Sequence, residues 1–138
     1  MTTDRLGNQY GGYHGPAVDI SQLPKVPKGS ATKMTLDEII DQCLADSHVW
    51  FPGNAEDLPF MTLATFGELG EFSNYVKKVE RGTHSPSQVR EGLEEEATDT
   101  FIYLMNIIGM LREQGFDLVQ AYQAKRAKNV QRFGGANL

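Results

Sequence analysis

Four successive segments of this 138-residue chain repeat apolar residues every three or four positions. This spacing matches the 3.6-residue turn of an α-helix, and strand signals are absent from the sequence. The pattern predicts helices from Thr35 to Trp50, from Asp57 to Arg81, from Ser85 to Glu113 and from Asp117 to Gly134. We therefore expect an all-α protein, built as a four-helix bundle.

Capping and turn residues mark the ends of these predicted helices. Thr35 precedes Glu38 by three positions, as in a capping box, and Asp117 with Gln120 resembles a second such arrangement. Pro86 suits the first position of the third helix, and a glycine follows each of the last three segments. Local chemistry thus predicts where the helices begin and end.

Residues 1–33 differ from the rest of the chain. They contain five glycines and three prolines without helical periodicity, which predicts an extended or flexible N-terminal arm. The helical domain is then expected to span residues 34–138. No function is assigned to the arm.

Charge and cysteine content exclude several classes of function. The chain has 13 Lys and Arg against 18 Asp and Glu, a net charge of −5, which opposes binding to nucleic acid or to an anionic membrane. The single Cys43 cannot form an intrachain disulfide, and no Cys/His set has zinc-binding spacing, so a cytoplasmic location fits best.

The longest apolar stretch lies in the third predicted helix. It runs from Phe101 to Leu111, is interrupted by Asn106, and is too short to span a membrane, which takes about 20 residues. Because the segment from Thr100 to Leu111 is apolar nearly all round, we expect other helices to enclose it, including those of a partner subunit.

Two pairs of acidic residues are the candidate metal ligands. Glu68 and Glu71 lie three residues apart on the second predicted helix, and Glu96 and Asp99 repeat that spacing on the third. Residues three apart project from one side of a helix, and the turn between the two helices allows the pairs to face each other. Four converging carboxylates repel unless a hard cation joins them, so the pattern predicts a Mg²⁺ site, with Mn²⁺ as a possible substitute.

Two other interpretations of the acids remain at this stage. Glu91 and Glu94 in this chain share the same spacing, and such acids are usually only a solvated helix face. A di-iron or di-manganese bundle would need Glu-x-x-His motifs, and neither His48 nor His84 stands three residues after a glutamate. The context of the two pairs, within apolar segments, favours a metal site over both.

Polar and basic residues suited to phosphate follow the same helices. Asn74 and Lys78 come three and seven residues after Glu71, and Lys125, Asn129 and Arg132 form a second line on the last helix. Ammonium and guanidinium groups neutralise transferring phosphates. For Arg132 a solvated basic face at the helix C-terminus is an equal alternative.

Aromatic residues precede the first acid pair. Trp50, the only tryptophan, lies with His48 and Phe51 just ahead of the second helix and could form a stacking wall for a nucleobase. Core packing explains a single tryptophan equally well.

Taken together, these motifs resemble the MazG-type all-α nucleoside triphosphate pyrophosphohydrolases, most closely the compact single-domain forms often carried by bacteriophages. The resemblance covers roughly residues 36–134 and rests on motifs that occur in the family's order. They are Phe66-Gly67-Glu68-Leu69-Gly70-Glu71-Phe72, Asn74 with Val76-Lys77-Lys78, Glu95-Glu96-Ala97-Thr98-Asp99 leading into Tyr103-Leu104, and Lys125, Lys128-Asn129 and Arg132-Phe133-Gly134.

The resemblance implies hydrolysis of a nucleoside triphosphate to a monophosphate and pyrophosphate, with Mg²⁺ held by the four acids. It implies that Glu68 or Glu71 orients the attacking water, with Glu68 preferred, and that Lys78, Lys125 and Arg132 offset phosphate charge. Asn129 would bind sugar, phosphate or a metal-bound water. The resemblance further implies a homodimer or a homotetramer.

Two alternatives stay open. The chain could be a dUTPase- or dCTPase-like enzyme that also accepts diphosphates, or a catalytically inactive helical interaction protein. The preferred base and sugar are not predicted, because the base pocket depends on packing that the sequence does not reveal.

Overall fold

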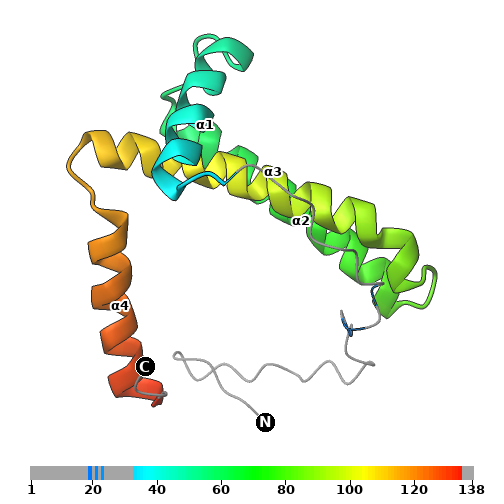
Figure 1. Cartoon of the computed structure of the whole chain (residues 1–138). Coiled ribbons are helices and arrows are strands. Elements are labelled where there is room, and N and C mark those ends of the chain that lie inside the picture. Colours follow the sequence, from blue (N-terminus) through cyan, green and yellow to red (C-terminus); the bar gives the residue numbers. More distant parts are fainter. Residues whose placement is uncertain (1–18, 20, 22, 24–32, 135–138) are drawn as a thin grey trace.

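The computed structural model describes residues 19, 21, 23 and 33–134 (Figure 1). Within these residues the chain forms four helices and no strands. The all-α class predicted from the spacing of apolar residues is therefore confirmed. The arm predicted for residues 1–33 lies outside the described residues except for positions 19, 21, 23 and 33.

The helices begin and end close to the predicted positions. They are α1 (Leu36–Trp50), α2 (Leu58–Glu80), α3 (Pro86–Glu113) and α4 (Leu118–Phe133). None of the described helices is both long and apolar enough to cross a membrane.

Side chains at the helix starts explain this agreement. The Thr35 hydroxyl oxygen accepts from the Glu38 N–H at 3.2 Å, while the Glu38 carboxylate accepts from the Thr35 N–H at 2.6 Å. The Asp117 carboxylate accepts from the Gln120 N–H at 2.9 Å at the start of α4. Gly115, between α3 and α4, has φ +94°, a conformation that other residues rarely adopt.

The centre of the molecule is an antiparallel hairpin of α2 and α3, with α1 packed against the second half of α3 (Figure 1). Two glycines on α3 allow this close packing. A side chain at Gly92 would overlap the Tyr75 ring of α2, and a Cβ at Gly109 would lie 2.6 Å from Leu44 Cδ1 of α1.

A small apolar core joins α1 to α3. Ile40 and Cys43 of α1 are buried against Met105 of α3. At the edge of this core the Arg112 guanidinium forms ion pairs with Asp37, at 3.4 Å, and with Asp41. Apolar contact and charge therefore both fix α1 on α3.

The fourth helix departs from the expected bundle. It leaves the end of α3 and extends away from the other three helices (Figure 1), and none of its residues is buried. One chain therefore builds a three-helix body with a projecting helix. Correspondingly, the apolar half of α3 is only partly enclosed: Met105 and Gly109 are buried, but Phe101, Leu104 and Leu111 remain exposed.

Candidate metal centre

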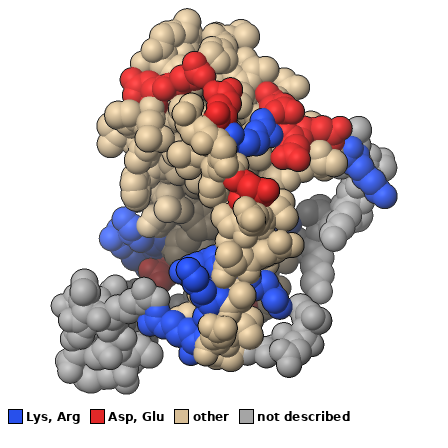
Figure 2. Space-filling model, turned by 90° about the vertical axis from the view of Figure 1, so that its left-hand side faces the viewer, with Lys and Arg blue, Asp and Glu red and all other residues tan. Residues whose placement is uncertain are grey.

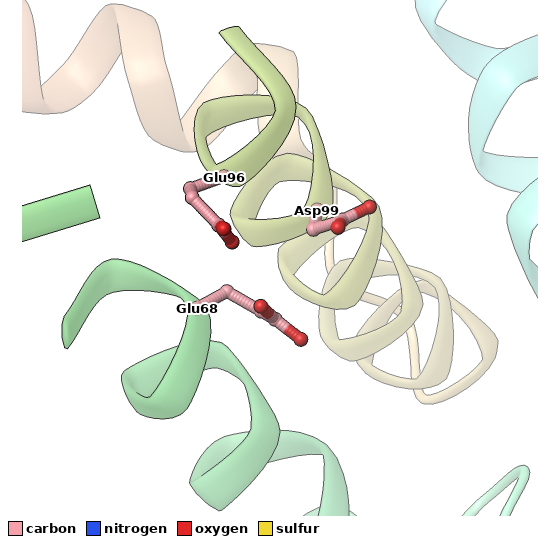
Figure 3. A group of neighbouring side chains, drawn as sticks. All are labelled: Glu68, Glu96 and Asp99. Atoms are coloured by element: carbon pink, nitrogen blue, oxygen red, sulfur yellow. The ribbon is translucent and has the colours of Figure 1, made fainter. Parts of the chain in front are cut away.

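Three carboxylates meet between α2 and α3. Glu68 projects from the middle of α2, and Glu96 and Asp99 project from consecutive turns of α3 (Figure 3). One oxygen from each lies within 4.8 Å of the others. Glu96 is buried, whereas Glu68 and Asp99 are half-buried. The hairpin thus brings acids that are 28 residues or more apart in sequence to one point.

The electrostatics of this cluster are those of an uncompensated acid site. Burial raises the pKa of Glu96 above its ordinary value of 4.5. The charge of Glu71, a hydrogen bond with Glu68 and the charges of Glu68 and Glu95 raise that pKa further. A cation would relieve this repulsion, because it stabilises the ionised form of each carboxylate.

Glu71 stands apart from the other three predicted ligands. Its side chain is exposed, and its oxygens are not among those that converge. It still lies close enough to affect the pKa of Glu96. The structure therefore brings together three of the four predicted acids and leaves the fourth at the rim.

The polar residues of α2 have partners of their own. Lys78 Nζ lies 4.6 Å from the centroid of the Tyr75 ring, and Lys77 Nζ donates to the Asn74 carboxamide oxygen at 3.2 Å. None of the ion pairs in the described part of the chain involves Glu68 or Asp99. The cluster thus has no internal counter-charge.

The basic residues of α4 are not at the cluster. Lys125 and Asn129 line an open hollow on the surface of α4, and the Arg132 guanidinium lies 4.7 Å from the Phe133 ring centroid. Because α4 projects from the body, one chain does not bring these predicted phosphate-binding residues beside the acids.

The predicted base-stacking residues also point elsewhere. Trp50 ends α1 with 58% of its surface exposed, and His48 lines a shallow hollow with Ala55 and Glu56. Phe51, the next residue, is the aromatic side chain of this segment that turns inward. Its ring lies 5.7 Å from that of Tyr103 and 5.6 Å from that of Phe60.

Sequence reasoning assigned no role at the site to Tyr103 or Asn106. Burial raises the pKa of Tyr103 above 10.0, and the charges of Glu68 and Asp99 raise it further, which places the phenol beside the cluster. Asn106 is fully buried and its carboxamide oxygen has no hydrogen-bond partner. An unpaired buried polar group costs about 1–3 kcal/mol, so packing alone does not explain Asn106.

The spacing of both residues from Asp99 along the predicted helix is a signal that could have identified them. Tyr103 and Asn106 follow Asp99 at four and seven positions, so the three side chains share one face of α3. Along this face, Asp99 lies at the acid cluster, Tyr103 contacts Phe51, and Asn106 is buried in the interior of the molecule.

The comparisons with known proteins give no family for this chain. No family model, curated protein or solved structure matches it. Its function is therefore proposed from the geometry of the site and from the sequence motifs.

Proposed function

We propose that this chain is a Mg²⁺-dependent nucleoside triphosphate pyrophosphohydrolase, which hydrolyses its substrate to a monophosphate and pyrophosphate. The observation that carries the proposal is the convergence of Glu68, Glu96 and Asp99 from two helices, with their oxygens within 4.8 Å. The sequence resemblance to the MazG-type enzymes supplies the reaction class.

The donor set fits a hard divalent cation. All three groups are carboxylates, and Mg²⁺ prefers oxygen ligands and commonly joins a few carboxylates to substrate phosphates. Mn²⁺, which accepts the same oxygen ligands, would substitute. Glu68, Glu96 and Asp99 would hold the ion, which when bound would supply positive charge to the triphosphate and acidify water.

The remaining groups have distinct tasks in this mechanism. Glu71 is exposed beside the cluster and outside the convergent trio, so its carboxylate is available to orient the attacking water and accept its proton. The sequence instead suggested Glu71 as a fourth metal ligand and preferred Glu68 for orienting the water. Lys78, Lys125 and Arg132 would balance phosphate charge, and Asn74 and Asn129 would donate hydrogen bonds.

The aromatic group beside the acids supports a nucleotide substrate. Tyr103 contacts Phe51 and lies close to Glu68 and Asp99. A nucleotide whose phosphates are bound at the cluster would therefore have flat aromatic surfaces within reach of its base. Phe51 and Tyr103 thus fit the stacking role better than Trp50 or His48.

Exposed apolar residues support a homodimer or homotetramer. Leu63, Phe66 and Leu69 on α2 are 73%, 69% and 49% exposed, and Phe66 and Leu69 line a hollow with Val76. Contiguous apolar surface of this kind is typical of association sites.

The test is a panel of nucleoside triphosphates, each incubated with Mg²⁺, with nucleotide products separated by chromatography and pyrophosphate measured directly. We expect monophosphate and pyrophosphate in equal amounts. Asp99→Asn should abolish turnover, whereas Glu91→Gln, an exposed acid on the same helix, should not alter it.

Each result has a clear meaning. Full activity in Asp99→Asn would overturn the metal site, and turnover of diphosphates would favour the dUTPase- or dCTPase-like alternative. Absence of turnover by the wild-type chain across the panel would favour an inactive interaction protein.

Metal binding is measured separately from turnover. Ligands that bind only the folded chain raise its stability, by about 2.7 kcal/mol at a concentration 100 times Kd. We expect Mg²⁺ to raise the melting temperature of the wild type and of Glu91→Gln but not that of Asp99→Asn. An equal rise in all three would place the ion elsewhere.

A further inference from the structure

The interior of the body contains two fully buried neutral polar residues, Ser47 on α1 and Asn106 on α3, each 1% exposed. The Ser47 hydroxyl donates to the Leu44 carbonyl oxygen at 2.7 Å. The Asn106 carboxamide oxygen, in contrast, has no hydrogen-bond partner. Because an unpaired buried polar group destabilises the folded state, this oxygen calls for a donor that the described part of the chain does not supply.

Asn106 lies midway between two contacts that α3 makes with the segment of α1. Three residues later, Gly109 lies against Leu44, and three residues earlier, the Tyr103 ring centroid lies 5.7 Å from that of Phe51. The buried serine of α1 falls between Leu44 and Phe51 in the sequence, so this register places it level with Asn106. The two helices therefore enclose a neutral polar position, next to the aromatic pair.

One face of α3 changes from charged to neutral along its length. Asp99, Tyr103 and Asn106 share this face, and Asp99 belongs to the acid cluster. The seven residues from Asp99 to Asn106 span about 10 Å of helix. Figure 2 shows other acidic and basic side chains on one outer face of the molecule. A ligand that extends along the buried line needs an anionic end, held through a cation, and a neutral polar end.

We infer that Asn106 is a specificity-determining residue, which hydrogen-bonds the edge of a nucleobase that lies between the rings of Phe51 and Tyr103. A nucleotide has the required polarity, because its phosphates carry the charge and its base is neutral. The N–H groups on the edge of a base supply the donor that the Asn106 oxygen lacks. The inference rests on the proposed function for the nature of the ligand, but base binding does not require hydrolysis.

Entry of a base requires a small movement of Phe51. Two rings that both contact a base between them lie about 7–8 Å apart, because each contact takes roughly 3.5–4.0 Å. The ring centroids of Phe51 and Tyr103 are now 5.7 Å apart. Phe51 follows the last residue of α1 and precedes a turn in which Gly53 has φ +90°. Its ring can therefore shift by the remaining distance of about 2 Å while α1 stays packed on α3.

The position of Asn106 also limits how far the base extends. It lies three residues beyond Tyr103, about 4.5 Å along the axis of α3. One-ring and two-ring bases that stack on the same aromatic side chain present their edges at different depths. Both cannot hydrogen-bond a carboxamide that is held at one depth. We therefore expect the chain to distinguish pyrimidine from purine nucleotides.

Equilibrium binding tests this role without turnover. Calorimetry with Mg²⁺ gives the Kd of α,β-imido analogues of the four deoxynucleoside triphosphates, in which the bond to be hydrolysed is replaced, and of inorganic triphosphate, which has no base. Asn106→Leu removes the carboxamide at similar volume. It should raise the Kd of the preferred analogue about 10- to 100-fold, bring pyrimidine and purine analogues to similar Kd values, and leave inorganic triphosphate unaffected.

Two further variants separate base recognition from folding. Asn106→Ser withdraws the polar group from the base and should cause the same selective loss. Met105→Leu, a volume-conserving change at the adjoining buried position, is the matched control and should alter no Kd. Without ligand, Asn106→Leu should melt no lower than wild type, because it replaces an unpaired polar group by an apolar one.

Three results would overturn the inference. They are unchanged Kd values in both Asn106 variants, an equal loss of affinity for inorganic triphosphate, and a wild type that binds nucleotide analogues no better than inorganic triphosphate. The proposed function is judged separately. Selective binding without hydrolysis of the natural triphosphates would refute it and retain the base contact, whereas hydrolysis with a base preference that survives in Asn106→Leu would do the reverse.

Discussion

Helices α1 and α4 are nearly equal in length, 15 and 16 residues, and both begin with a side chain that caps the first turn, yet only α1 is docked. Helix α1 buries Ile40, Cys43 and Ser47, whereas α4 buries nothing. Helix α1 packs against α3, whereas α4 follows α3 along the chain without packing on it. The comparison shows that a segment can form a capped helix without packing against the rest of its chain.

The difference lies in the surface that each helix meets. Helix α1 finds a gap at Gly109, which admits Leu44, and a cation at Arg112 opposite Asp37 and Asp41. Helix α4 has four cations and no acid, and the chain offers it no such matching surface. Capping is local, but docking requires complementary shape and charge.

The largest effect is expected at Gly109. In Gly109→Ala the new methyl group would lie 2.6 Å from Leu44 Cδ1, so the Leu44 side chain must move within the packed α1–α3 contact, and we expect a loss of about 1–3 kcal/mol in the free energy of unfolding. The control is Gly70→Ala, where nothing lies within 4 Å and better helix propensity predicts a gain of about 0.5–1 kcal/mol. Urea denaturation followed by circular dichroism measures both, and equal stabilities would show that α1 is not tightly packed.

The helix caps test the comparison directly. Thr35→Ala should lower the free energy of unfolding by about 1 kcal/mol, because α1 unfolds together with the core it covers. In the monomer, Asp117→Ala should instead speed amide exchange within the first turn of α4 and leave global unfolding unchanged. Thr35→Ser, which keeps the hydroxyl, serves as the control. A global loss from Asp117→Ala at low protein concentration would mean that α4 belongs to the cooperative unit.

A smaller loss is expected from Arg112→Met. The substitution keeps the apolar stem but removes the ion pairs that join α3 to Asp37 and Asp41 of α1. Because salt screens exposed ion pairs, the difference from wild type should shrink as ionic strength rises. Arg90→Met, which removes a pair within α3 alone, should cost less at low salt. Equal losses from the two variants would show that the bridge between helices adds nothing to docking.

The smallest effect concerns acid. Hydrogen bonds from the Thr35 backbone and hydroxyl lower the pKa of Glu38 below 4.5, so its stabilising contribution is present above pH 4.5 and is lost as the pH falls through the folded-state pKa. Glu38→Gln should remove this part of the acid-induced decrease in melting temperature. The corresponding residue of α4, Gln120, does not titrate. An unchanged pH profile in Glu38→Gln would contradict the role assigned to this cap.

Much of the fold was predictable because helix signals are local. The capping residues Thr35 and Asp117, Pro86 and the glycines that follow the last three helices act through neighbours within about one turn, and the helices begin and end near them. The spacing of Glu96 and Asp99 likewise placed both acids on one side of α3.

The site was predictable only in part. The sequence identified Glu68, Glu96 and Asp99, but not that Glu71 lies outside their convergence, because the orientation of α2 against α3 decides which carboxylates meet. Tyr103 was visible only as part of a motif, and its contact with Phe51 joins residues 52 positions apart. In the sequence, Asn106 is only an interruption of an apolar stretch. That its carboxamide is buried and its oxygen unpaired is known only from the tertiary structure.

The sequence by itself determined which segments are helical, where each begins and ends, and which acids share a helix face, because periodicity and capping depend on contacts within a few residues. Tertiary structure alone decided which helices touch: Gly92 and Gly109 admit Tyr75 and Leu44, and α4 is left without a surface in its own chain. Docking depends on the match between two surfaces far apart in sequence, and no local pattern encodes that match.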